Sequence, residues 1–121
     1  PRTCLCRRSD EMVELLRGTG AKVCFDTNHA LGEDNLHFLR GLLEGGLELA
    51  TLHISDYDGI DERHRLPGDG INDWKGILSI LSEADYRGPL MYEVPAQPKE
   101  RERIPLADLA DNMRRLAGGE I

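Results

Sequence analysis

The stretch HISDYDGIDERHRLPGDGINDW, residues 53 to 74, contains the pattern that decides the fold. It leaves the apolar run of residues 49–54, turns through Pro67-Gly68 and Gly70, and enters an amphipathic helix. A short apolar run, a polar loop and a helix form one βα unit, the repeating element of parallel α/β folds. Because burying so many polar groups at one strand end costs free energy, they favour a shared partner such as a divalent metal or a polyhydroxylated ligand.

The same succession of strand, loop and helix occurs along the rest of the chain. Strands are expected at residues 22–26, 49–54 and 90–94. Helices are expected at residues 9–17 and 33–44, from 73 onward, and from 105 to 116. Short apolar strands that alternate with helices are typical of a parallel sheet covered by helices. The sequence therefore predicts an α/β fold with about three βα units.

This number of strands is too small to close a barrel by itself. A (β/α)8 barrel needs eight parallel strands and about 250 residues, whereas the chain has 121 residues. We therefore expect residues 1–121 to form one partial barrel domain. Its unpaired strand edges and uncovered sheet face predict that the chain forms a homo-oligomer or associates with a missing N-terminal half.

Three side chains suited to metal binding are expected at the C-terminal ends of the three strands: Asp26, His53 and Glu93. Functional groups gather at that edge in parallel α/β folds. Two carboxylates and an imidazole form a mixed oxygen and nitrogen set that suits Mn²⁺, Mg²⁺, Fe²⁺, Co²⁺ or Zn²⁺. Each residue alone has a structural explanation, as a cap, a hydrogen-bonded histidine or an ion pair. Their recurrence at equivalent strand ends favours the metal site.

Further polar residues of the loops have more than one interpretation. The spacing of His29 from Asp26 fits a second ligand, a substrate contact or loop surface equally well. Glu62 and His64 form a carboxylate-x-histidine pair, for which a solvated charged loop is the simpler interpretation. The remaining loop carboxylates are interpreted as polar loop groups, one of which can orient His53 from outside the ligand set: Asp56, Asp58 and Asp61.

Composition excludes several classes of protein. Acidic residues outnumber basic ones by 22 to 15, for a formal charge of −7, which weighs against binding nucleic acid. No apolar run approaches the length of a membrane span. Three cysteines in no metal-binding spacing, with no signal peptide, predict reduced thiols and a cytoplasmic protein.

Four motifs in order resemble those of a known family: FDTNH at 25–29, HISDYDG at 53–59, H-x-x-P-G-x-G at 64–70 followed by DW at 73–74, and YEV at 92–94. Together they resemble the xylose isomerase-like TIM barrels, which include the sugar phosphate isomerases/epimerases and the type 2 AP endonucleases. The resemblance implies that the chain is the C-terminal half of such a barrel, with strands six to eight and their flanking helices.

The resemblance also implies roles for individual residues. Asp26 resembles the metal-binding aspartate after the sixth strand, and His53 the metal-binding histidine of the seventh. Glu93 resembles the glutamate of the eighth strand, which binds metal and exchanges a substrate proton. His29 resembles a histidine that contacts the sugar in the isomerases or binds a further metal in the endonucleases.

Glu62 and His64 lie where the endonucleases carry Asp-x-His for an additional metal, but the carboxylate here is Glu. The family's other essential glutamate lies on the fifth strand, and no Glu precedes Asp10 in this sequence. One copy is therefore expected to lack a ligand.

These features predict the C-terminal portion of a divalent-metal-dependent sugar or sugar phosphate isomerase/epimerase. Its reaction would be proton transfer through a cis-enediolate, with Mn, Mg, Co or Zn as the metal. One alternative is a metal-dependent phosphodiesterase of the AP endonuclease type, which the acidic charge disfavours. The other alternative is a catalytically inactive fragment that oligomerises.

Overall fold

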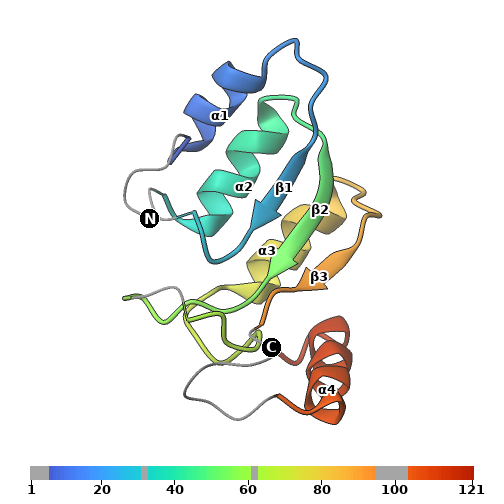
Figure 1. Ribbon diagram of the computed structural model, residues 1–121. Coiled ribbons are helices and arrows are strands. Elements are labelled where there is room, and N and C mark those ends of the chain that lie inside the picture. The colour runs from blue at the N-terminus through green and yellow to red at the C-terminus, as the bar shows by residue number, and fades with distance from the viewer. Residues whose placement is uncertain (1–5, 31–32, 61–62, 95–103) are drawn as a thin grey trace.

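Helices and strands alternate in the order that the sequence predicts (Figure 1). The computed structural model describes residues 6–30, 33–60, 63–94 and 104–121. The elements within them are α1 (Ser9–Leu16), β1 (Val23–Asp26), α2 (Asn35–Glu44), β2 (Leu49–Ile54), α3 (Trp74–Glu83), β3 (Leu90–Tyr92) and α4 (Leu106–Ala117). The main difference from expectation is β3, which ends at Tyr92 and leaves Glu93 just beyond the strand.

The three strands form one parallel sheet in the order β1-β2-β3. Asp26 is the register partner of His53, and His53 is the partner of Met91. The Glu93 N–H donates to the Ile54 carbonyl over 3.0 Å, which keeps Glu93 beside the end of β2. This parallel register brings the three C-terminal strand ends to one edge of the sheet.

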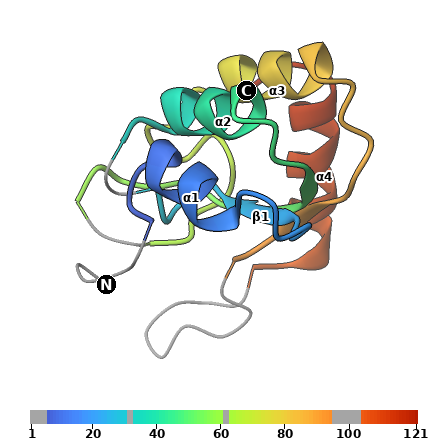
Figure 2. The same ribbon diagram turned by 90° about the horizontal axis from the view of Figure 1, so that it is seen from above.

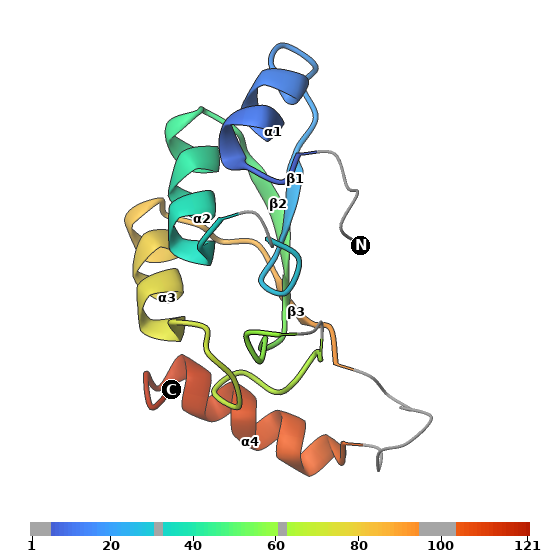
Figure 3. The same cartoon turned by 90° about the vertical axis from the view of Figure 1, so that its left-hand side faces the viewer.

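Helices α1, α2 and α3 lie on one face of the sheet (Figures 1 and 3). The core between them consists of buried apolar side chains: Val23, Phe25, Phe38, Leu39, Leu42, Leu49, Leu52, Ile54, Trp74, Ile77, Ile80, Leu81 and Leu116. Two carboxylates cap these helices, since Asp34 accepts from N–H groups in the first turn of α2 and Asp73 from Gly76 N in α3. Asp73 thus caps the N-terminus of α3.

The opposite face of the sheet has no helix over it within the described residues (Figure 3). Side chains alternate between the faces of a strand, so Phe25 and Leu52 point to the helices while His53 points to the open face. Met91, the register partner of His53, also lies on that face with 51% of its surface exposed. The strand-end residues therefore lie on a surface that is accessible in this chain.

Helix α4 crosses the C-terminal end of the sheet at an angle to α2 and α3 (Figures 2 and 3). Buried Asn112 anchors it, because its amide donates to the Pro67 carbonyl and accepts from the Tyr92 hydroxyl, each over 2.8 Å. Leu116 joins the core, but Leu106 and Met113 are 76% and 56% exposed. The apolar side chains of α4 are thus only partly buried.

Candidate metal centre

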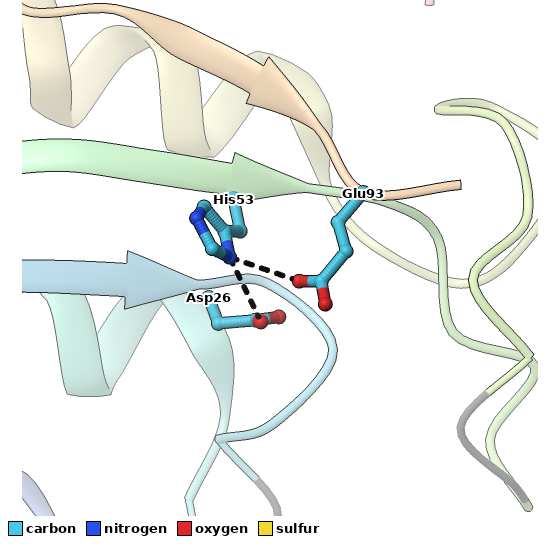
Figure 4. A group of neighbouring side chains, drawn as sticks. All are labelled: Asp26, His53 and Glu93. Atoms are coloured by element: carbon cyan, nitrogen blue, oxygen red, sulfur yellow. Dashed lines mark hydrogen bonds and ion pairs between the residues drawn. The ribbon is translucent and has the colours of Figure 1, made fainter. Parts of the chain in front are cut away.

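Asp26, His53 and Glu93 converge at the C-terminal edge of the sheet (Figure 4). One potential ligand atom from each lies within 4.8 Å of the other two. His53 Nδ1 is 3.0 Å from Glu93 Oε2 and 3.9 Å from Asp26 Oδ2. The structure thus places together the three residues that the sequence singled out on separate strands.

His29 and His64 border this group of three. His29 Nδ1 lies 2.9 Å from Asp26 Oδ2, and the rings of His29 and His64 meet edge to face at 5.4 Å. His64 Nδ1 lies 3.0 Å from the main-chain carbonyl oxygen of Glu93. Glu62, predicted as a partner of His64 in an additional metal site, lies outside the described residues.

Asp56 organises the loop that carries His64. Its side chain is fully buried and accepts from the Gly68 N–H at 2.8 Å, the Trp74 indole N–H at 2.9 Å, and the Asn72 and Tyr57 N–H groups at 3.0 Å. None of the Asp56 contacts in the described structure is to His53, so its role is to hold the loop rather than to orient that histidine. Sequence reasoning missed this role, because the partners lie up to 18 residues away.

Gly70 is required beside this carboxylate for reasons of space. A Cβ atom there would lie 2.4 Å from Asp56 Oδ1 and 2.2 Å from the Tyr57 carbonyl oxygen. Both neighbours are held in place, so a larger residue would displace the loop. The motif glycine thus has a packing reason.

Thr27 and Ser55 lock the ends of β1 and β2 together. The Thr27 hydroxyl donates to the Ser55 carbonyl over 2.7 Å and accepts from the Ser55 N–H over 3.1 Å. Both residues are buried. Thr27 directly follows Asp26, and Ser55 lies two residues after His53. A small hydroxyl residue just past a strand is the only sequence signal for this contact.

The two carboxyl groups of the centre differ electrostatically. Burial raises the pKa of the Asp26 carboxyl, and its hydrogen bond to Glu93 adds to that increase. The same hydrogen bond, followed by the one from His53, holds the pKa of Glu93 below its ordinary value. The pKa values of the two carboxyl groups are therefore shifted in opposite directions, upward for buried Asp26 and downward for Glu93.

This donor set is compatible with a divalent metal ion. Two carboxylate oxygens and one imidazole nitrogen lie close enough together to face one cation. Asp26 is 14% exposed, while His53 and Glu93 are 38% and 42% exposed. His53 and Glu93 are therefore accessible from the open face.

The chain belongs to the xylose isomerase-like TIM barrel family, whose model matches residues 1–117. Its fold is part of such a barrel, as the sequence predicted. The crystal structure of a D-tagatose 3-epimerase-like protein superposes with a TM-score of 0.76 at 20% identity, over 98% of this chain and 42% of that one. The chain is also similar to the uncharacterized protein y4fM of Sinorhizobium fredii, with 38% identity over 74 residues.

The chain corresponds to only part of each of these proteins. The match to y4fM covers 60% of this chain and 23% of that protein, and less than half of the epimerase-like protein is covered.

Among the described residues, none of the helices is long and apolar enough to cross a membrane.

Proposed function

We propose that this chain is the C-terminal portion of a divalent-metal-dependent sugar or sugar phosphate isomerase/epimerase. The convergence of Asp26, His53 and Glu93 on the open face carries this proposal. Family membership and the likeness to a D-tagatose 3-epimerase-like protein support it. The cytoplasmic location stays a prediction from the sequence.

In this proposal Asp26, His53 and Glu93 hold the ion, which is Mn²⁺, Mg²⁺, Co²⁺ or Zn²⁺. A bound divalent ion would polarise the carbonyl and adjacent hydroxyl oxygens of a sugar and so acidify the hydrogen on the neighbouring carbon. Glu93 accepts that proton, because its carboxylate lies beside His53 and Asp26 and so within reach of a sugar bound there. His29, beside Asp26, binds a sugar hydroxyl.

A second carboxylate must return the proton to the adjacent carbon and complete the passage through the cis-enediolate. We infer that it comes from the fifth-strand glutamate that the family resemblance implies. That residue would lie on an N-terminal half of the barrel that covers the open face, because a second copy of this chain would lack it too. The ligand set is then completed across the interface.

Calorimetric titration of the metal-free chain with Mn²⁺ tests the proposal directly. Asp26→Ala and Glu93→Ala are each expected to weaken binding by at least about tenfold, since even partners outside the ligand set contribute 10- to 100-fold. Asp108→Ala, a change on exposed α4, is the control and should leave the affinity unchanged. Equal Mn²⁺ affinity in the wild type and all three variants would contradict the proposed metal centre.

A second candidate is a metal-dependent phosphodiesterase of the AP endonuclease type. The edge-to-face contact of His29 and His64 beside the three proposed ligands favours it, because these histidines can contribute to a multi-metal cluster. The formal charge of −7 disfavours it. Cleavage of a DNA duplex with an abasic site, without turnover of ketoses, would replace the isomerase proposal.

A third possibility is a catalytically inactive fragment that oligomerises, because the fifth-strand glutamate that the resemblance implies is not among the three residues that converge in the described structure. Ketose turnover by the chain, assayed with Mn²⁺ present, separates it from an active enzyme. Turnover by the chain would exclude an inactive fragment, whereas Mn²⁺ binding without turnover is also expected if the second carboxylate comes from an N-terminal half of the barrel.

A further inference from the structure

Glu93 lies at a position where the strand no longer holds the main chain. β3 ends at Tyr92 and is an edge strand within the described sheet. The Glu93 N–H bonds to β2 through the Ile54 carbonyl, whereas its own carbonyl oxygen has a different partner. His64 is that partner, with Nδ1 at 3.0 Å from the carbonyl oxygen.

This contact determines which ring nitrogen of His64 carries the proton. A carbonyl oxygen can only accept a hydrogen bond, so Nδ1 must donate. The Ser55 hydroxyl oxygen lies 3.2 Å from the same nitrogen and can accept a share of the same hydrogen. In the neutral ring the lone pair is then on Nε2.

The loop is built to hold this ring in place. His64 has a φ of 47°, a left-handed conformation that residues other than glycine rarely adopt. The next residue, Arg65, is fixed by two main-chain hydrogen bonds with Asp56, of 2.8 and 3.0 Å. The buried Asp56 side chain holds the following turn at Gly68. The strained residue is thus anchored by its neighbours, and its ring is directed at Glu93.

We propose that His64 is a positioning residue for Glu93. Its Nδ1–H fixes the Glu93 main chain, and thereby the place of the Glu93 carboxylate beside His53 and Asp26. The consequence for metal affinity rests on the proposed function, whereas the hydrogen bond itself does not. This role differs from direct ligation by His64, which would use Nε2.

Two substitutions separate the roles of the two ring nitrogens. Asparagine tolerates a positive φ, and its side-chain N–H₂ is as many bonds from the main chain as histidine Nδ1. His64→Asn therefore keeps a donor for the Glu93 carbonyl but has no counterpart of Nε2. Glycine also tolerates the conformation, so His64→Gly removes the ring without backbone strain.

The first readout is nuclear magnetic resonance of the metal-free protein. The wild-type His64 ring is expected to carry its proton on Nδ1. Exchange of the Glu93 amide hydrogen with solvent should accelerate several-fold to about tenfold in His64→Gly, the range for loss of one hydrogen bond, and return to near the wild-type rate in His64→Asn. His37→Ala, on the exposed side of α2, is the control and should have no effect.

The second readout is Mn²⁺ affinity by calorimetry. His64→Gly should bind about tenfold more weakly than wild type, and His64→Asn should bind nearly as tightly as wild type. A wild-type chain that binds no Mn²⁺ would contradict the proposed function, while the exchange rates would still decide the positioning role.

Three results would overturn the inference. The first is a wild-type His64 proton on Nε2. The second is unchanged Glu93 exchange in His64→Gly. The third is equal loss of Mn²⁺ affinity in both variants, which would assign His64 to direct ligation through Nε2.

Discussion

Asp26 combines two requirements in one side chain. It must be buried enough to sit at the strand end, yet charged when it binds a cation. Burial raises the pKa of its carboxyl in the metal-free protein, so folding favours the protonated form. This contribution to stability is present at low pH and is lost as the pH rises through the pKa of the folded state. Glu93, with a lowered pKa, has the opposite dependence and loses its contribution as the pH falls.

Asp26→Asn is therefore expected to raise the melting temperature of the metal-free protein at pH 7 by several degrees, where about 1 kcal/mol corresponds to about 4–8 °C. The gain should shrink as the pH falls below the ordinary carboxyl range, because wild-type Asp26 is then also protonated. Thermal unfolding at both pH values checks this. With Mn²⁺ the order should reverse, since only wild type gains binding energy. A lower melting temperature for the variant at pH 7 without metal would contradict the assignment.

The loop between β2 and α3 is the element that depends most on tertiary contacts. Its central carboxylate, Asp56, bonds to groups at both ends of the loop, including Gly68 and the indole of Trp74. The periodicity of residues 74–81 predicts α3 and its buried face from sequence. No local pattern predicts the path of the loop, because its hydrogen bonds join residues far apart in the chain.

Asp56→Ala is expected to lower the free energy of unfolding by about 3 kcal/mol or more, because it leaves several buried N–H groups without an acceptor. Urea unfolding followed by circular dichroism measures this. Asp69→Ala, in the same loop but exposed, is the matched control and should change stability by no more than about 0.5 kcal/mol. Similar losses in the two variants would mean that Asp56 does not organise the loop.

At the scale of the whole molecule, one face of the sheet lacks a covering helix within the described residues. Helices cover one face, while the proposed ligands and Met91 lie on the other. A sheet face without a covering helix, bordered in the described structure by unpaired strand edges, can pair with another polypeptide. We propose that this face associates with a second copy or with an N-terminal half of the barrel.

If this face associates with a second copy, the purified chain is expected to be a dimer or larger oligomer in light scattering after gel filtration. Met91→Lys should shift the equilibrium between oligomer and monomer toward monomer, because a buried, unpaired ammonium group opposes association. Leu15→Lys, on exposed α1, is the control and should not. A wild-type monomer at high concentration would leave the N-terminal half as the partner to seek.

The sequence by itself determined the order of helices and strands and placed Asp26, His53 and Glu93 at strand ends, because these features follow from local periodicity and turn residues. A parallel α/β fold then requires those ends to share an edge. Only the tertiary structure decided that His64 reaches the Glu93 carbonyl, that Asp56 is buried within its loop, and that α4 crosses the end of the sheet. These depend on how distant segments pack, and the free energies involved belong to contacts that no short stretch of sequence contains.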